Sequence, residues 1–255
     1  MKSWLIFRHS FRQVTNNLGS AARVSLVPFI LAVLVVFAVV ISAGGLSRAR
    51  ADIGMAPGGV FLIIFGLMFY LALTITIAVN WHRYVLLNEP VTWWPSFHGA
   101  RILQYFGRSL LIGIVFGIGM AIAMGVSGAV VSTGSFGRMV GMVLMFATVV
   151  ASMSIFWRLS AALPGAAIGG SSLGDAWNKT RGTWGTMLML TLIYVGFALL
   201  TGIVGAILTY MGAKIGIFLI LKFIWEVVVG WFTMMLVLSI LTTLYGHYVE
   251  KRALV

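Results

Sequence analysis

Long uncharged apolar segments recur along this chain and constrain its fold more than any other feature. Six of them approach twenty residues, which is enough for an α-helix to cross a hydrocarbon core of roughly 30 Å. The composition agrees, because 61% of the 255 residues are hydrophobic and 9% are charged, whereas a soluble domain carries about a quarter charged residues. The ten-residue alternation of a barrel strand is absent. We therefore predict an all-α membrane protein with a single polytopic domain over 1–255, whose spans are 24–46, 59–80, 109–131, 139–157, 185–211 and 225–248.

The last apolar stretch, 215–248, is too long for one span and contains Lys222 and Glu226. We expect 214–224 to lie at the membrane interface and the sixth span to begin at Trp225. A seventh span would need a helix shorter than about seventeen residues. Lys222 and Glu226 have the spacing of an ion-paired helical turn. A carboxylate within a membrane could instead bind a coupling ion, but Glu226 falls at the predicted end of a span.

The charges that flank the spans favour one orientation. Twelve of the 17 Lys and Arg residues fall on segments that share a side with the two termini, and five fall on the other side. The positive-inside rule then places both termini in the cytoplasm. The net charge of +12 is spread over span ends, so we expect anionic lipid headgroups as partners and no nucleic acid. The absence of cysteine excludes disulfides and thiolate metal sites.

Three stretches before the odd-numbered spans read alike: SFRQVTNNLG, SFHGARILQYFG and AWNKTRGTWG, which begin at residues 10, 96 and 176. Each carries an aromatic residue at its second position, namely Phe11, Phe97 and Trp177. We predict three units, each consisting of an interfacial amphipathic helix followed by a two-span hairpin. The alternative is that Trp, Tyr and Arg mark every span boundary.

The first 20 residues show the predicted interfacial helix most clearly. Its apolar positions recur at helical spacing, and Arg8, Arg12, Gln13 and Asn16 fill the other face. We expect the apolar side chains to lie among the acyl chains of the membrane, although a short soluble cap is an alternative. These side chains are Trp4, Phe7, Phe11, Val14 and Leu18.

Small residues repeat every fourth position on two of the spans. Such stripes allow close contact between helices in a membrane, so we expect these spans to be the central packing helices. Lining of a pore is the alternative, but the stripes carry almost no polar groups. The residues are Gly113, Gly117, Ala121 and Gly125 on the third span, and Ala198, Gly202 and Ala206 on the fifth.

Polar and aromatic residues crowd together in AVNWHRYVLLNEPVTWWPSFHGAR, residues 78–101. His82, Glu89 and His98 are metal-ligand types, but spacings of seven and nine residues match no compact ligand motif. We expect no metal and no cofactor there, and Asp175 to lie at the start of an interfacial helix. No Walker loop, nucleophile elbow or paired-carboxylate pattern occurs elsewhere, so we expect no enzyme.

Basic residues at the predicted cytoplasmic boundary suit anionic lipid headgroups, because Arg can hold a phosphate with two parallel hydrogen bonds. Arg83 and Arg158 occupy corresponding places after the second and fourth spans, so we expect them to form similar pockets. The candidate headgroup-binding residues are His82, Arg83, Arg101, Arg158, Lys179 and Arg181.

The segment FWRLSAALPGAAIGGSSLGDAWNKTRGTWGTMLMLTL, residues 156–192, resembles bacterial six-span membrane proteins related to the membrane domain attached to some glycerophosphodiester phosphodiesterases. The resemblance rests on Arg158, Pro164, Leu173, Asp175, Ala176, Trp177, Thr180 and Trp184. It implies a membrane anchor or accessory fold in a bacterial inner membrane, without the catalytic domain of the longer relatives.

Two classes of function follow from these features. We favour a non-catalytic, lipid-associated protein with a membrane-organising, scaffold or accessory role, possessing a membrane-protein partner or forming a homo-oligomer. The alternative is a transporter or channel for a small or lipidic solute, which would need a continuous polar cavity at the bilayer midplane. An intramembrane enzyme ranks third, because the spans offer no buried acid, base or nucleophile.

Overall fold

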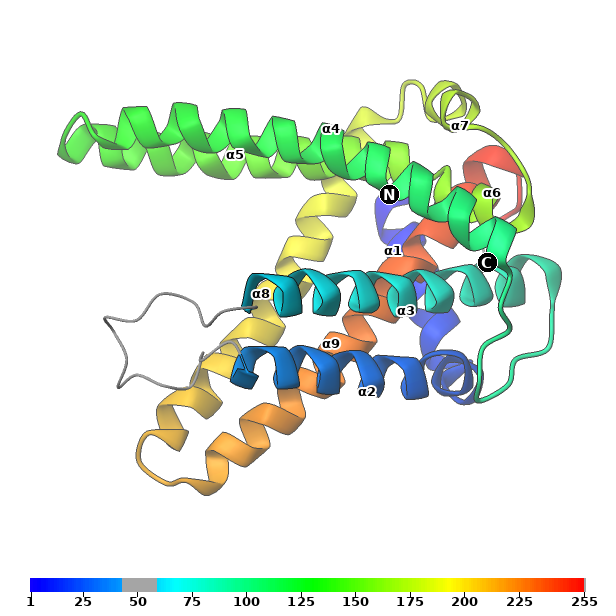
Figure 1. Cartoon of the computed structure of the whole chain (residues 1–255). Helices are drawn as coiled ribbons and strands as arrows, with labels where there is room; N and C mark the ends of the chain where they lie inside the picture. Colours follow the sequence, from blue (N-terminus) through cyan, green and yellow to red (C-terminus); the bar gives the residue numbers. More distant parts are fainter. Residues whose placement is uncertain (43–58, 255) are drawn as a thin grey trace.

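The computed structural model describes residues 1–42 and 59–254, and every regular element in these ranges is a helix (Figure 1). Six helices are long and apolar enough to cross a membrane. The prediction of an all-α, six-span membrane protein is therefore confirmed, although residues 43–46 of the first predicted span lie outside the described residues. The six helices are α2 (Leu18–Ser42), α3 (Gly59–Leu87), α4 (Gly99–Val131), α5 (Ser135–Ser160), α8 (Trp184–Gly212) and α9 (Ile217–Leu244).

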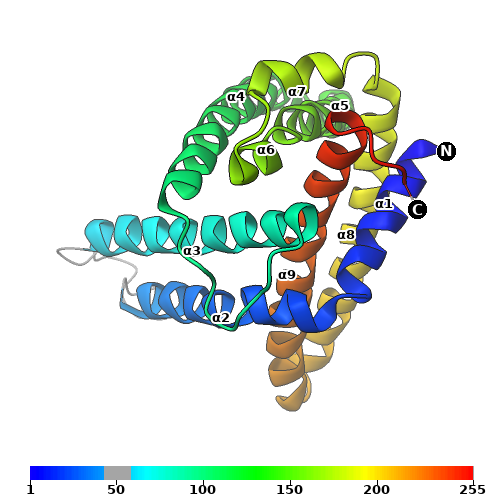
Figure 2. The same cartoon turned by 90° about the vertical axis from the view of Figure 1, so that its right-hand side faces the viewer.

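These helices pack as three antiparallel pairs, α2 with α3, α4 with α5, and α8 with α9. The pairs diverge from a common end that holds both termini and the short helices α1 (Lys2–Thr15), α6 (Leu163–Ile168) and α7 (Leu173–Lys179) (Figures 1 and 2). We call this end the base. The α4–α5 turn depends on Gly134, whose φ of 111° is favoured only by glycine. The three predicted hairpins are therefore present.

Helix α9 is the centre of the packing at the base, because its residues from Met235 to Leu244 are almost wholly buried. It bonds to other helices through hydroxyl groups. Ser239 Oγ accepts from the indole Nε1 of Trp81 on α3 over 3.0 Å, and Thr243 Oγ1 lies 2.9 Å from Ser10 Oγ on α1. Each such bond satisfies two buried polar groups and fixes the relative position of two helices.

The amino-terminal helix α1 forms as predicted, but its apolar face contacts protein. Ile6 and Val14 are fully buried, and the ring of Phe11 packs edge-on against Phe232 of α9 with centroids 5.3 Å apart. The expectation that this face lies among acyl chains is therefore wrong for these residues. The reason is that the small Ser3 and Ser10 share the face and let α1 lie close to α8 and α9.

The other two predicted interfacial helices have different outcomes. Residues 99–108 form the first turns of α4 without a break, because nothing between Gly99 and the span interrupts a helix, so the separate second helix was wrongly predicted. The third exists as α7, where Ser172 and Asp175 form a capping box with reciprocal hydrogen bonds. This confirms Asp175 at the start of a helix.

The three aromatic residues of the predicted repeat do not occupy equivalent places. Phe11 packs inside the base, Phe97 is 82% exposed ahead of α4, and Trp177 lies on α7 beneath the guanidinium of Arg158. The segments before the hairpins therefore do not share one arrangement, and a repeat among the hairpins stays a prediction.

The sixth long helix begins earlier than predicted, because α9 begins at Ile217 and continues without a break through most of the segment 214–224 that was expected to lie at the interface. The apolar sequence IFLILKFIW contains no residue that breaks a helix. The ion pair predicted for this turn is confirmed, since Lys222 Nζ lies 3.6 Å from Glu226 Oε1.

The two stripes of small residues do not mark the central packing helices, and this prediction is wrong. No side chain or neighbouring helix would lie within 4 Å of a Cβ atom added at Gly113, Gly117, Gly125 or Gly202, and Ala121, Ala198 and Ala206 are exposed. Close contact occurs instead at Gly141, between α4 and α5, and at Gly212, between α8 and α9. A four-residue repeat predicts that the small residues share one face of a helix, but it does not predict which helix or lipid packs against that face.

Candidate functional site

His82, expected to meet lipid headgroups, is fully buried at the base. Its Nδ1 atom lies 2.8 Å from Thr242 Oγ1, and its Nε2 atom lies 3.3 Å from the hydroxyl of Tyr105. Thr242 donates its only proton to the carbonyl of Leu238 over 2.8 Å. His82 Nδ1 must therefore be the donor to Thr242, which leaves Nε2 to accept from Tyr105. His82 is a bridge between α3, α4 and α9, and its assignment as a headgroup ligand is wrong.

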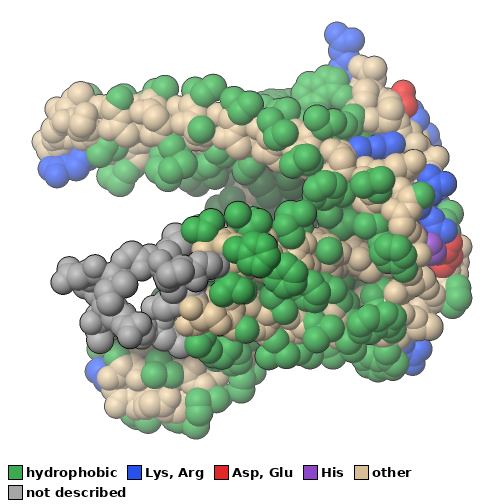
Figure 3. All heavy atoms as spheres, in the orientation of Figure 1, with side chains coloured by type: hydrophobic (Ala, Val, Ile, Leu, Met, Phe, Trp, Pro, Cys, Tyr) green, Lys and Arg blue, Asp and Glu red, His purple; other side chains and the backbone are tan. Residues whose placement is uncertain are grey.

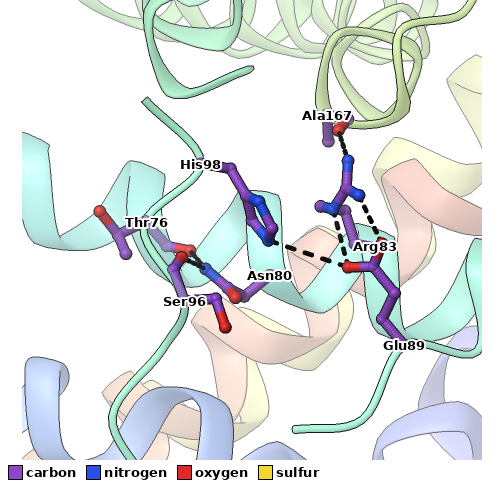
Figure 4. A network of polar contacts seen from close by, with 7 residues as sticks. All are labelled: Thr76, Asn80, Arg83, Glu89, Ser96, His98 and Ala167. Atoms are coloured by element: carbon purple, nitrogen blue, oxygen red, sulfur yellow. Dashed lines mark hydrogen bonds and ion pairs between the residues drawn. The ribbon is translucent and has the colours of Figure 1, made fainter. Parts of the chain in front are cut away.

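Arg83 is also engaged within the protein (Figure 4). Its guanidinium forms a two-pronged ion pair with Glu89, in which Nε donates over 2.8 Å, and Nη1 donates to the carbonyl of Ala167 on α6 over 2.9 Å. The hydrogen bonds from Arg83 hold the pKa of Glu89 below its ordinary value. A guanidinium with these partners does not suit a lipid phosphate, so this candidate is corrected as well.

The loop between α3 and α4 is tied to α3 by neighbouring contacts in the same network. Asn80 Nδ2 donates to the carbonyls of Thr76 and Ser96 over 2.9 and 3.0 Å, and His98 lies 3.8 Å from Glu89 (Figure 4). His98 and Glu89 therefore come together, whereas His82 faces Thr242 and Tyr105. The three metal-ligand types of this segment do not meet at one point.

Four of the predicted basic residues remain nearer the surface, and each has a different environment. Arg158 lies 3.8 Å above the ring of Trp177 and donates to its carbonyl over 3.3 Å, unlike Arg83, so the predicted similarity of the two pockets is wrong. Arg101 donates to Gln104 over 3.1 Å, and Lys179 lies 3.4 Å from the carbonyl of Val249. Arg181 is exposed.

One basic residue of the base was not among the candidates. Arg108 Nη1 donates to the carbonyls of Ala162 and Ser171 over 3.1 and 2.6 Å. It thereby fastens the first turns of α4 to both ends of the α6 segment. Together with Arg83, it shows that partly buried arginines at the base donate to backbone carbonyls in and beside the short helix α6.

A large apolar cavity that was not predicted lies between the helices. It has a volume of about 490 Å³, within the usual range for small-molecule and cofactor sites. Figure 3 shows a deep hollow between the α4–α5 hairpin and the α2–α3 hairpin, with hydrophobic side chains along its edges. Its lining includes Leu71, Ile75, Ala78, Tyr105, Phe106, Ile112, Gly113, Phe156, Val237 and Leu241.

The hydroxyl groups that line this cavity are already engaged. Thr74 Oγ1 donates to the carbonyl of Tyr70 over 2.7 Å, and Ser109 Oγ donates to that of Tyr105 over 2.7 Å. The hydroxyl of Tyr105 is directed to His82. A guest in this cavity would therefore meet mainly hydrocarbon.

Comparison with protein-family models, with curated proteins and with solved structures finds no match. The geometry of the base and of the apolar cavity is therefore the ground for a functional proposal.

Proposed function

We propose that this protein is a non-catalytic, multi-pass membrane protein that associates with lipids by holding an acyl chain in the apolar cavity between its hairpins. The observation that carries the proposal is the cavity of about 490 Å³, lined mainly by α3, α4 and α9, with Phe156 of α5 and Leu163 of α6. In a bilayer, a hollow lined by aliphatic and aromatic side chains takes up hydrocarbon, because burying apolar surface there avoids an empty space.

The same cavity argues against the alternative of a transporter or channel for an ion or hydrophilic solute. Such a path needs polar groups that replace the hydration shell of the solute. The hydroxyls of Thr74 and Ser109 are directed to backbone carbonyls of their own helices. A lipidic guest fits this lining, so the proposal keeps lipid as the bound molecule.

Anionic lipids are the proposed class, with a reduced set of basic residues. Arg158, Lys179 and Arg181 are only partly buried or exposed, and each basic residue near an anionic surface adds about 1 kcal/mol of attraction. Trp177 beneath Arg158 is an amphipathic ring of the kind that lies at headgroup depth. These three residues replace the six that the sequence suggested.

The orientation remains part of the proposal. Lys and Arg side chains gather along the base in Figure 3, which favours a cytoplasmic base and a bacterial inner membrane. In a chain without cysteine, S135C should react with an impermeant thiol reagent in intact cells, and S172C should not. The reverse pattern would overturn the orientation.

Two glycines on α4 allow a matched test of the acyl-chain site. Gly113 lines the cavity and Gly117 does not, yet both have open space where a side chain would be added. In nanodiscs with phosphatidylglycerol that carries a diazirine in one acyl chain, wild-type crosslinks should concentrate at Leu71 and Leu241. Gly113→Leu should reduce that labelling at least twofold, and Gly117→Leu should leave it unchanged.

The outcome is read by mass spectrometry of the labelled peptides, with exposed Ile118 as a reference position. Equal labelling at Ile118 and at the cavity residues would mean that the bilayer contacts all of them alike. Equal reductions of cavity labelling by Gly113→Leu and Gly117→Leu would mean the same. Either result would remove the cavity as a lipid site.

The relation to the membrane domain of glycerophosphodiester phosphodiesterases stays a prediction. An accessory role beside lipid chemistry agrees with a protein that holds lipid without transforming it. We propose no reaction for this chain.

A further inference from the structure

A second, smaller cavity lies at the base and is polar where the first is apolar. Its volume is about 200 Å³, and its lining shares no residue with the apolar cavity. It lies between α1, the end of α3, the end of α9 and the segment 252–254. The side chains that line it with nitrogen or amide groups are those of His9, Gln13, His247 and Arg252.

The backbone around this polar pocket is unusual. Helix α9 passes at Tyr245 into a π-helical turn, Tyr245–Val249, which supplies Gly246 and His247 to the wall. Turns of this kind are rare and occur often at functional sites. Lys251 then adopts a left-handed conformation with φ of 64°, which glycine would adopt with less strain.

These features turn the chain back over the pocket. The amide of Arg252 donates to the carbonyl of Gly246 over 2.8 Å, and Arg252 Nη2 donates to the carbonyl of Leu86 over 3.1 Å. His247 Nδ1 lies 3.1 Å from the carbonyl oxygen of Arg252. The wall is therefore held in place by three separate contacts. The strained residue Lys251 lies next to Arg252 in this wall, and backbone strain of this kind often occurs at functional sites.

Among the described residues, the lining has the guanidinium of Arg252 as its permanently charged group. No Asp or Glu belongs to it among the residues that the structure describes. Arg252 pairs through Nε with Glu250 at 2.6 Å and uses Nη2 for Leu86, so Nη1 is not engaged by either contact. The Oε1 atom of Gln13 is buried and has no hydrogen-bond partner within the described ranges. A buried amide in that state calls for a ligand or water.

We infer that this polar pocket binds a phosphate group of a phosphomonoester or phosphodiester, with His247, Arg252 and the amide of Gln13 as its contacts. The guanidinium of Arg252 can donate to phosphate oxygens through Nη1, and the imidazolium form of His247 can donate through Nε2 while Nδ1 donates to the carbonyl of Arg252. After a half-turn of its terminal amide group, Gln13 can donate to a phosphate oxygen through its NH₂ group. The volume equals roughly six or seven waters, more than a carboxylate would fill.

The phosphate group could belong to a lipid headgroup at the membrane surface or to a soluble phosphoester. Free phosphoesters can be tested with the full chain in nanodiscs of phosphatidylcholine, by calorimetric titration with glycerol 3-phosphate and with inorganic phosphate. Lipid can be tested in nanodiscs that contain phosphatidic acid, by measuring how much of it stays bound in native mass spectrometry.

Binding in at least one arm is expected, and H247N and Q13L should each weaken it at least tenfold or remove the retained phosphatidic acid. R8Q removes an exposed basic residue of α1 outside the pocket and should change neither readout. Circular dichroism of each variant checks that the helices remain formed. Binding of free phosphoester identifies a soluble ligand, and retention of phosphatidic acid alone identifies a headgroup.

No binding in either arm, or equal losses in R8Q and H247N, would overturn the inference. Loss of helical signal in H247N would leave Q13L as the deciding variant. The inference is separate from the acyl-chain proposal, because the two cavities share no residue. The Gly113→Leu variant, whose apolar cavity is filled, should bind glycerol 3-phosphate as the wild-type protein does. The two ideas can therefore fail independently.

Discussion

Helix α4 and the segment Ile217–Val249, which comprises α9 and the π-helical turn, are nearly equal in hydropathy but differ in what surrounds them. Their most apolar windows have mean hydropathies of 2.3 and 2.2, yet 11% of the first window and 50% of the second are buried. In α9 the hydroxyls of Ser239, Thr242 and Thr243 bond to other helices. Apolar composition therefore places a helix in the membrane, while hydrogen bonding and close packing decide which helix becomes the core.

The largest effect should come from truncating the same residue type in the two regions. Ile240 of α9 is fully buried, and Ile118 of α4 is 58% exposed. Ile240→Ala should lower the free energy of unfolding by about 2–5 kcal/mol, because it leaves a cavity in the core. Ile118→Ala should stay within about 0.5 kcal/mol of wild type. Denaturation in mixed micelles measures both, and similar losses would break the comparison.

A second pair of variants sharpens the comparison within the α4–α5 hairpin. A Cβ atom at Gly141 would lie 3.0 Å from the carbonyl oxygen of Ser127 and would collide with Val131. Gly141→Ala should therefore destabilise the protein by about 1–3 kcal/mol. Gly117→Ala meets open space and should be neutral or stabilising by up to about 1 kcal/mol, because alanine favours a helix.

The same micelle assay reads both glycine variants. A large loss of stability for Gly117→Ala would mean that the stripe of small residues on α4 packs against another chain. A neutral Gly141→Ala would show that the hairpin is looser than its closest contacts indicate.

The smallest effect concerns the attachment of the loop between the α2–α3 and α4–α5 hairpins. Because Arg83 lowers the pKa of Glu89 from its ordinary 4.5, the carboxylate stabilises the fold above that value. This contribution is lost as the pH falls through the lowered pKa. Wild type should therefore lose more stability than Glu89→Gln between pH 7 and strongly acidic pH.

The difference should be under about 1 kcal/mol, because the carboxylate is partly exposed and screened. Unfolding curves at several pH values for the two proteins give the measurement. Parallel pH profiles would show that the Arg83–Glu89 pair adds nothing to the attachment.

The elements that could be predicted are those with a local cause. Uninterrupted apolar runs predict the six long helices, and a serine three residues before an acidic residue predicts the start of α7. The ion pair of Lys222 and Glu226 follows from helical spacing alone. These features need no knowledge of what lies beside each helix.

The site residues depended on tertiary contacts and were mostly missed. His82 and Arg83 are adjacent in sequence, yet one is buried against Thr242 and the other pairs with Glu89. The opposite charges of Arg83 and Glu89, six residues apart, were a usable signal. No pattern marks Tyr105 or the apolar cavity, because that cavity arises from the angle between hairpins.

The hydroxyl contacts of α9 have a consequence for the biogenesis of the protein. Ser10, Trp81 and His82 are synthesised 233, 158 and 160 residues before their partners Thr243, Ser239 and Thr242. Until α9 is inserted, the side chains of Ser10, Trp81 and His82 lack these hydrogen-bond partners. The base can therefore close only after α9 has been synthesised and inserted, so α9 completes the assembly of the helices that precede it.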